Sequence, residues 1–243
     1  MTPERYQKFR TVLDRRQPDL TVLTDQVHKP HNLGAIIRTC DAVGIHEIHL
    51  TQPRNGYRQF RRRSMGSYQW VNIRLHDSIK DSAESLKSLG FKIYAAHFSE
   101  QAIPYNQVDF TLPCALMLGA EKSGVSHEAA SLADEHIIIP MQGMVSSYNV
   151  SVAAAVILIE AQHQRQQKGM YNNARLPGDI YQRTLFQWGY PELTRYCDER
   201  MLDYPPLNDS GQLINPSQWY AQVRAISHSG QSVTGKHHED TAN

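Results

Sequence analysis

Short apolar runs alternate with amphipathic segments along residues 19–167. Runs with the length of buried strands are 20–23, 47–51, 92–97, 114–118 and 136–139, and an alternating run is 70–75. Segments with apolar residues at helical spacing are 32–43, 78–89, 126–133 and 149–167. Gly44 and Gly90 follow two of these segments and predict where the helices end. The alternation predicts an α/β fold, a mostly parallel sheet with helices on both faces.

The pattern changes on both sides of this α/β region. Residues 3–16 predict a short helix with an apolar stripe and basic side chains around it, and three short helices are predicted later at 179–188, 192–201 and 216–226. The last residues are polar and rich in Gly, Ser and His, which indicates disorder. We expect four parts: an N-terminal basic helix (1–17), an α/β domain (18–168), a helical C-terminal extension (169–226) and a disordered tail (227–243).

Composition limits the class of protein. Hydrophobic residues make up 40% of the chain and charged residues 20%, which are ordinary values for a globular protein. No apolar run approaches the roughly 18 residues of a membrane span, and the polar N-terminus lacks the apolar core of a signal peptide. We therefore expect a soluble cytoplasmic protein. Cys40, Cys114 and Cys197 lie far apart, which predicts reduced structural thiols.

Positive charge is concentrated in two places, although the formal net charge is only +1. The first cluster lies near the start of the chain and comprises Arg5, Lys8, Arg10, Arg15 and Arg16. The second is free of acidic residues and comprises Arg54, Arg58, Arg61, Arg62 and Arg63. Such clusters can attract phosphates, and Tyr57 and Phe60 within the second could stack on bases. A solvated charged loop is the alternative for 54–63.

Polar and glycine residues collect after three of the predicted strands, where open α/β sheets bind ligands. The first segment runs from Asn32 to Gly44, the second from 118 to 124, and the third from 140 to 151. Ser147 or Asn149 could cap the helix that follows the third segment. A simple capped turn remains an alternative there, and Glu121 in the second segment could be an ordinary surface acid.

Several common ligand-binding signatures are missing from the sequence. No two glycines stand in a GxG arrangement, which argues against a dinucleotide fold and a nucleotide-dependent oxidoreductase. No GxSxG turn of a serine hydrolase occurs either. His28 and His31 lie close together, but their proline-containing loop offers no third ligand, so we expect no metal site.

Taken in order, the three segments resemble the motifs of the SPOUT family of knotted methyltransferases, most closely its TrmH or SpoU branch of tRNA guanosine-2′-O-methyltransferases. The motifs read Asn32-x-x-Ala35-x-x-Arg38-Thr39-x-Asp41-Ala42-x-Gly44, Leu118-Gly119-x-Glu121-x-x-Gly124, and Ile139-Pro140-Met141-x-Gly143-Met144-x-x-Ser147-x-Asn149-Val150-Ser151-Val152-Ala153. The resemblance extends over roughly residues 3–226. Ser146 and Tyr148 depart from the branch, where Gln and Leu are commoner.

The resemblance implies an enzyme that uses S-adenosylmethionine to methylate a ribose 2′-hydroxyl of tRNA, at the D-loop guanosine in position 18. It also implies a deep trefoil knot in the 18–168 domain and a homodimer. The cofactor-binding residues that it implies are His97, Gly119, Glu121, Ile139, Met144, Tyr148 and Asn149. The catalytic and RNA-positioning residues that it implies are Asn32, Arg38, Glu121, Ser147 and Asn149.

Methyl transfer from a sulfonium is a direct displacement that needs no enzyme nucleophile and no metal. Because a guanidinium rarely gives up its proton, we expect Arg38 to hold a phosphate and stabilise the oxyanion rather than to act as a base. The alternative for Arg38 is a surface ion pair with Asp41, three residues further on the helix. The two basic clusters, apart from Arg10, are the expected tRNA contacts. An RNA-binding module without catalysis is the alternative function, which the intact site residues disfavour.

Overall fold

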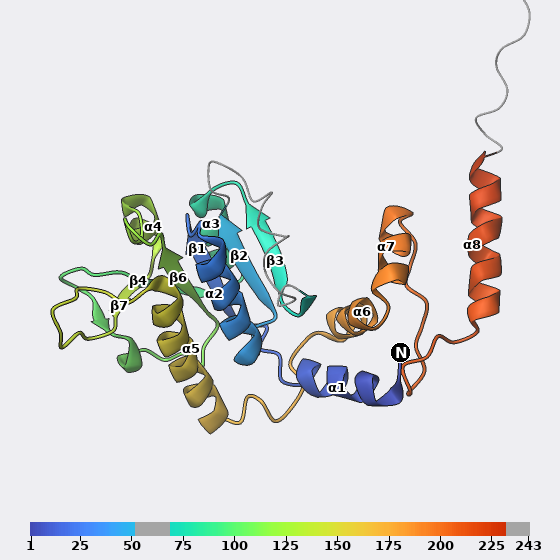
Figure 1. The fold of residues 1–243 in the computed structure, drawn as a ribbon, viewed down its shortest axis with the longest axis horizontal. Coiled ribbons are helices and arrows are strands. Elements are labelled where there is room, and N and C mark those ends of the chain that lie inside the picture. The colour runs from blue at the N-terminus through green and yellow to red at the C-terminus, as the bar shows by residue number, and fades with distance from the viewer. Residues whose placement is uncertain (52–68, 232–243) are drawn as a thin grey trace, which may run out of the picture. The chain divides into compact units, whose positions relative to one another are not determined.

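The structure is a computed structural model, and it describes residues 1–51 and 69–231. It divides into two compact units (Figure 1). One unit spans Thr11–Gly178, and the other combines Met1–Arg10 with the described residues from Asp179 onward. Each unit is described by itself. The division into four parts stays a prediction.

A seven-stranded parallel sheet forms the centre of the first unit (Figure 1). Its strands are β1 (Leu20–Asp25), β2 (Glu47–Thr51), β3 (Asn72–His76), β4 (Lys92–Ala96), β5 (Ile103–Pro104), β6 (Cys114–Gly119) and β7 (Glu135–Ile138). Their order in the sheet is β3-β2-β1-β6-β4-β7-β5. The register pairs Asp25 with Gly119, so β1 and β6 end side by side.

Helices cover both faces of this sheet, as the sequence predicts. The helices α2 (Pro30–Ala42) and α5 (Val150–Gln167) pack on one face, where Leu116 and Leu118 of β6 join their core. The helices α3 (Ile79–Ser88) and α4 (His127–Leu132) pack on the other, with Ala115 and Met117. Because neighbouring residues of a strand point to opposite faces, the uniformly apolar β6 supplies both cores. The α/β class is confirmed.

The ends of the helices follow local chemistry. Ser78 caps α3, because its side chain accepts a hydrogen bond from the Asp81 N–H at 3.0 Å. After α2, Gly44 has a left-handed φ of +85°, and a Cβ there would lie 2.7 Å from the Arg15 carbonyl oxygen. Only glycine fits this turn without displacing the backbone.

The second unit is helical. It contains α6 (Gly178–Gly189) from Asp179 onward, α7 (Pro191–Glu199) and α8 (Pro216–Gln231), together with the first residues of α1 (Pro3–Leu13). Phe9 of α1 packs edge-on against Trp188, with ring centroids 5.6 Å apart. The N-terminal residues therefore share a core with the C-terminal helices.

Some details differ from the sequence-based predictions. The two-residue strand β5 and the short 3₁₀ helix η2 (Tyr105–Gln107) were not predicted, because they are too short to show a period. Helix α8 is described as far as Gln231, and the residues of the expected disordered tail from 232 onward lie outside the described residues, so the tail stays a prediction. All three cysteines are free and buried, as expected. In the parts that the structure describes, no helix is long and apolar enough to cross a membrane.

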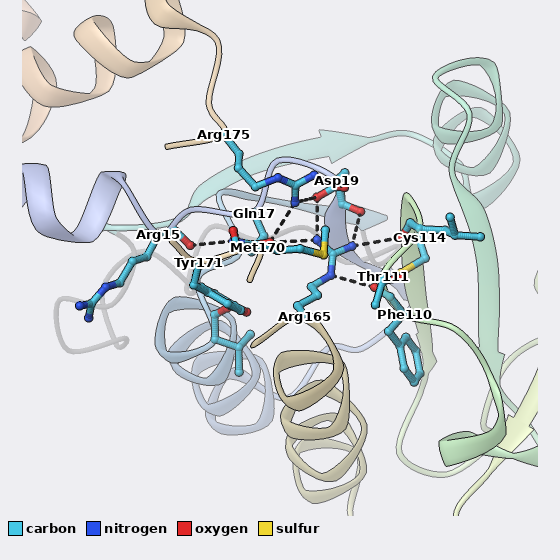
Figure 2. Close-up of polar contacts among 12 residues, drawn as sticks. Arg15, Gln17, Asp19, Phe110, Thr111, Cys114, Arg165, Met170, Tyr171 and Arg175 are labelled. Carbon is cyan, nitrogen blue, oxygen red and sulfur yellow. Dashed lines mark hydrogen bonds and ion pairs between the residues drawn. The ribbon is translucent and has the colours of Figure 1, made fainter. Parts of the chain in front are cut away.

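A buried polar network lies at the amino ends of the strands (Figure 2). Arg165 of α5 is fully buried and donates hydrogen bonds to the Phe110 carbonyl at 2.8 Å and to Asp19 Oδ1 at 2.6 Å. Arg175 donates to both carboxylate oxygens of Asp19, each at 2.8 Å. Asp19 immediately precedes β1, so this network ties α5 and the chain after it to the start of the sheet.

Candidate active site

Three polar side chains meet at the carboxyl ends of β1 and β6. Asn32 on the first turn of α2 is buried, and its amide donates to Glu121 Oε1 at 2.8 Å. Its carbonyl oxygen accepts from the Asn149 amide at 3.2 Å. One residue from each of the three predicted motifs therefore takes part in a single hydrogen-bonded cluster, and we name Asn32, Glu121 and Asn149 the motif cluster.

A tight turn after β6 presents Glu121. Ala120 and Gly124 exchange backbone hydrogen bonds of 2.9 and 2.8 Å, which closes the turn around Glu121. A Cβ on Gly119 would lie 2.1 Å from the Gly124 carbonyl carbon and 2.1 Å from the Val125 nitrogen. Any side chain at position 119 would therefore force the turn open.

Glu121 is held as a buried anion. Its side chain is 7% exposed. Burial alone would raise its pKa, but hydrogen bonds from the Asn32 side chain and from backbone N–H groups, together with the nearby His28 imidazole, outweigh burial and lower the pKa. Oε2 of this carboxylate has no hydrogen-bond partner in the described residues, and His28 Nδ1 lies 3.6 Å away. A buried acceptor without a donor is rare, so Glu121 has capacity for a further contact.

Asn149 fixes the start of α5 against the motif cluster. Its side-chain oxygen accepts from the Ser151 N–H at 2.9 Å and from the Ser151 hydroxyl at 2.7 Å, which caps the helix. Its amide nitrogen is the group that donates to Asn32. The predicted cap is confirmed for Asn149. This residue caps α5 and also belongs to the motif cluster.

The loop of residues 141–148, before Asn149, has backbone N–H and carbonyl groups that form no hydrogen bond within the described structure. Met144 is fully exposed and Tyr148 is 46% exposed. Across the described parts of the chain, no hydrogen bond involves the backbone of residues 141–148. Exposed amides and carbonyls of this kind can bind the polar edges of an adenosine and of an amino acid, which fits S-adenosylmethionine. Ser147 in the same loop is exposed and makes no hydrogen bond to another described residue.

The remaining predicted cofactor residues lie at neighbouring strand ends. His97 directly follows β4, and its N–H donates to the Ile137 carbonyl at 3.2 Å. Ile139 directly follows β7 and is partly buried against the α2/α5 core. These two residues and Gly119 therefore end three strands that are neighbours in the order β6-β4-β7.

Arg38 is exposed on α2 and forms no hydrogen bond or ion pair with the residues that the structure describes. The alternative of a pair with Asp41 is wrong, because Asp41 binds Arg16 at 2.6 Å. Arg16 is 0% exposed and also donates to the Ile45 carbonyl at 2.9 Å. The prediction that Arg16 contacts tRNA is therefore wrong, since its charge is used inside the fold.

The other predicted tRNA contacts remain predictions. Arg5, Lys8 and Arg15 are exposed. Arg54, Arg58, Arg61, Arg62 and Arg63, with Tyr57 and Phe60, lie outside the described residues. Within 1–51 and 69–231, no three His, Cys, Asp or Glu side chains are grouped to hold a metal ion. The sequence pattern suggests His28 only as a metal ligand, and nothing in it indicates that His28 Nδ1 lies 3.6 Å from Glu121 Oε2.

Comparison of the sequence with known protein families identifies the family of this chain. The model described as "SpoU rRNA Methylase family" matches residues 19–159, which is more than half of the chain. The chain belongs to the SpoU methylase family. A second model, "SpoU, rRNA methylase, C-terminal", matches residues 163–216. The SPOUT resemblance inferred from the three motifs is therefore confirmed.

Curated SpoU relatives match between 77% and 93% of the chain. The tRNA (guanosine(18)-2′-O)-methyltransferase of Escherichia coli is 47% identical over 227 residues, which is 93% of this chain and 99% of the relative. The protein of the same name from Thermus thermophilus is 52% identical over 187 residues, 77% of this chain and 96% of the relative.

Solved SpoU structures share the fold. The Aquifex aeolicus TrmH/SpoU tRNA modifying enzyme superposes with a TM-score of 0.72 at 39% identity, covering 78% of this chain and 97% of that one. The SpoU methyltransferase AviRb from Streptomyces viridochromogenes was solved in complex with the cofactor AdoMet. It matches with a TM-score of 0.54 at 30% identity, over 63% of this chain and 62% of its own.

Proposed function

We propose that this chain transfers a methyl group from S-adenosylmethionine to the ribose 2′-hydroxyl of the guanosine at position 18 of tRNA. The observation that carries the proposal is the motif cluster, in which all three SpoU motifs meet through hydrogen bonds of 2.8 and 3.2 Å. The relatives named for this reaction match up to 93% of the chain, so the proposal applies to the whole catalytic unit.

Positioning is the main task of the chain's own residues. The bound cofactor supplies the methyl group, and the 2′-oxygen must lie in line with it. Correct alignment of two reactants can lower a barrier by several kcal/mol, up to about 7–11 kcal/mol. The motif cluster is suited to this task because buried, mutually hydrogen-bonded side chains hold one geometry. We assign Asn32, Glu121, Ser147 and Asn149 to orient the ribose and the loop around it.

Arg38 is assigned to the phosphate next to the target ribose. It is exposed on α2, six residues along the helix from Asn32, and has no protein partner among the described residues. A free guanidinium can bind a phosphate through two parallel hydrogen bonds. It can also stabilise negative charge as it develops on the 2′-oxygen, an effect of about 3–4 kcal/mol for one well-placed donor.

The cofactor is assigned to the strand ends and to the loop before α5. We assign the hydrogen bonds to the cofactor to backbone groups of Gly119, Ile139, Met144 and Tyr148, with His97 at the neighbouring end of β4. Glu121 and Asn149 complete the assignment. The support for it is the unpaired backbone of residues 141–148 in the described structure, together with the AdoMet complex of a SpoU relative.

We also propose a trefoil knot, a homodimer and a cytoplasmic location. The knot is supported by the insertion of β6 between β1 and β4, and by α5, which packs beside α2 (Figure 1). The dimer is supported by exposed apolar side chains in the loop before α5 and on α5 itself. Met144, Tyr148, Val152 and Ile159 are 103%, 46%, 44% and 56% exposed.

The test is methyl transfer to unmodified tRNA. The protein is incubated with radiolabelled S-adenosylmethionine and a tRNA transcript, and alkali-resistant linkages are mapped. A single 2′-O-methyl group at guanosine 18 is expected. Transfer to another nucleotide would change the substrate assignment. Absence of transfer to any RNA would refute the proposal that the protein is a methyltransferase. Calorimetry that shows no cofactor binding would favour the RNA-binding module instead.

A further inference from the structure

A cavity of about 380 Å³ lies in the helical second unit, between α6 and the chain that follows α7 (Figure 1). Its volume falls within the range of pockets that bind small molecules. Its lining includes Arg183 and Phe186 of α6, Asp198 of α7, and Asp203 and Tyr204 after it. All the lining residues belong to the second unit, and none of them takes part in the assignments made for methyl transfer.

Stacked aromatic rings form one wall of the cavity. Phe186 is 2% exposed, and its ring stacks on Tyr204 with centroids 4.7 Å apart and planes 17° apart. Tyr190 also stacks on Phe186, at 5.5 Å. Proteins that recognise single-stranded RNA pack its bases against aromatic rings of this kind. The aromatic wall therefore favours a flat, unsaturated ligand.

The wall is held in place before any ligand binds. The Tyr204 hydroxyl donates to Asp198 Oδ1 at 2.7 Å and accepts from the Gln187 side-chain amide at 3.2 Å. Pro205 and Pro206 follow Tyr204, and their fixed φ angles stiffen this part of the chain. A site that is already ordered loses less conformational freedom on binding, which favours affinity.

Two charged side chains of the lining have no charged partner. Asp203 is exposed, and its carboxylate forms no hydrogen bond or ion pair with the described residues, so both of its oxygens are free to accept. Arg183 is exposed, lies 5.6 Å from the centroid of the Tyr204 ring, and forms no ion pair within the described chain. A ligand of this cavity must therefore present hydrogen-bond donors to Asp203, and an anionic group would suit Arg183.

A guanine nucleotide meets these requirements. Among the four RNA bases, guanine alone carries two neighbouring donors on its Watson–Crick edge, N1–H and the 2-amino group. These two donors match the two oxygens of one carboxylate. The phosphate of the same nucleotide can form charge-assisted hydrogen bonds with a guanidinium such as that of Arg183.

We propose that this cavity binds an unpaired guanine base of the tRNA, packed against the aromatic wall and recognised by the Asp203 carboxylate. The inference rests on the proposed function, and it adds to the methylated ribose a base that the helical unit recognises. Asp198 is not the recognising carboxylate, because it already accepts a hydrogen bond from the Tyr204 hydroxyl and so holds the wall.

The first test is the affinity of Asp203→Asn for unmodified tRNA. Loss of a negative charge from a solvated surface should strengthen binding to a polyanion or leave it unchanged. If Asp203 recognises guanine, asparagine replaces one of two acceptors by a donor, so the affinity should instead fall by about tenfold. The affinity for S-adenosylmethionine should stay at the wild-type value. Calorimetry measures both affinities.

Asp209→Asn is the matched control. Asp209 is an exposed aspartate of the same unit, it does not line the cavity, and its side chain has no hydrogen bond or ion pair with the described residues. This variant removes the same charge, and it should bind tRNA at least as tightly as the wild-type protein does.

Free nucleotides test the identity of the base without turnover. Guanosine 5′-monophosphate and inosine 5′-monophosphate differ only in the 2-amino group, and each is titrated while the backbone amide NMR signals of Asp203 and Tyr204 are followed. We expect guanosine monophosphate to shift these signals, and inosine monophosphate to need about a tenfold higher concentration for the same shift. In Asp203→Asn the two nucleotides should no longer differ.

Unchanged or tighter tRNA binding by Asp203→Asn, or equal responses to the two nucleotides, would overturn the inference and leave the proposed function intact. Signals that respond to an arginine-containing peptide but to neither nucleotide would also overturn it, because the ligand would then be a protein side chain. Wild-type protein that transfers no methyl group would instead refute the proposed function, and the nucleotide titration tells this failure apart from a failure of the inference.

Discussion

Asn32 is the residue on which the candidate active site depends most. It is 2% exposed, and it satisfies the Glu121 carboxylate with its amide and the Asn149 amide with its carbonyl. Asn32 donates one hydrogen bond and accepts another, so its removal leaves two buried partners without a hydrogen bond. Its removal should therefore disturb both neighbouring motifs.

The variant Asn32→Ala should lower both stability and turnover. We expect the free energy of unfolding to fall by about 1–3 kcal/mol, because Glu121 and Asn149 lose buried partners. Methyl transfer should fall more steeply than tRNA affinity does. Denaturant titration and single-turnover assays measure the two effects. The control Asn173→Ala, at an exposed position, should change neither, and an Asn32→Ala variant with wild-type turnover would contradict the assigned role.

The sequence predicts residue roles from two kinds of pattern, the three motifs and the clusters of basic residues. Asn32, Glu121 and Asn149 were found through their motifs, and the structure brings them together. Arg16 was misassigned, because charge along a sequence does not reveal that a guanidinium is buried against Asp41. The contact of His28 with Glu121 joins residues that lie far apart in the chain, and no local pattern encodes such a contact.

At the scale of elements, a tight turn and a buried ion-pair network fix the two ends of the sheet. The turn after β6 shapes the carboxyl end, and the network of Asp19, Arg165 and Arg175 fixes the amino end (Figure 2). We expect a substitution in either feature to lower the stability of the protein.

Gly119→Ala should open the turn that presents Glu121. The added Cβ would meet backbone atoms at 2.1 Å, which no side-chain movement can relieve. We expect a lower melting temperature and a large loss of S-adenosylmethionine affinity, which calorimetry measures. Gly178→Ala is the control, because a Cβ there meets nothing within 4 Å. Unchanged affinity in Gly119→Ala would show that the turn takes no part in cofactor binding.

Asp19→Asn should destabilise the protein in a pH-dependent way. Burial alone would raise the Asp19 pKa, but hydrogen bonds from Arg175 and Arg165 outweigh it and lower the pKa. A lowered folded-state pKa adds stability above the unfolded pKa, near 4, and this stability is lost as the pH falls through the folded value. At pH 7 we expect the variant to lose about 3–5 kcal/mol, since buried Arg165 keeps an uncompensated charge.

Urea unfolding at pH 7 and at pH 3 measures this effect, and the gap between wild type and Asp19→Asn should narrow at the lower pH. Glu84→Gln breaks the exposed pair with Lys80 and serves as control, with an expected change below about 0.5 kcal/mol. A gap that is constant with pH would contradict the account.

Most elements could be predicted because their patterns are strong. Strand β6 is uniformly apolar, and Gly44 and Gly90 end helices in left-handed conformations. The strand order could not be predicted, since no local pattern records that β6 pairs with β1 and β4. The short β5 gave no periodic signal.

At the scale of the whole molecule, the proposed homodimer needs an exposed apolar surface, and α5 offers one. Val152 and Ile159 lie seven residues apart and so share one face of α5, opposite residues that are buried in the core. Exposed apolar side chains on a helix that also borders the active site are suited to a dimer interface.

The double variant Val152→Glu/Ile159→Glu should therefore be monomeric while it keeps its fold. Two carboxylates in an apolar interface oppose association, whereas on a free surface they cost little. Sedimentation equilibrium gives the mass and circular dichroism reports the fold. Leu89→Glu, at an exposed position just after α3, should leave the wild-type mass unchanged. A dimeric double variant would place the interface elsewhere.

The most direct measurement uses two tRNAs that differ by one oxygen atom. One carries guanosine at position 18 and the other carries 2′-deoxyguanosine there, and both are incubated with the protein and labelled S-adenosylmethionine. The account predicts one methyl group per molecule of the first tRNA and none on the second. Equal incorporation into both, or incorporation into neither, would contradict it.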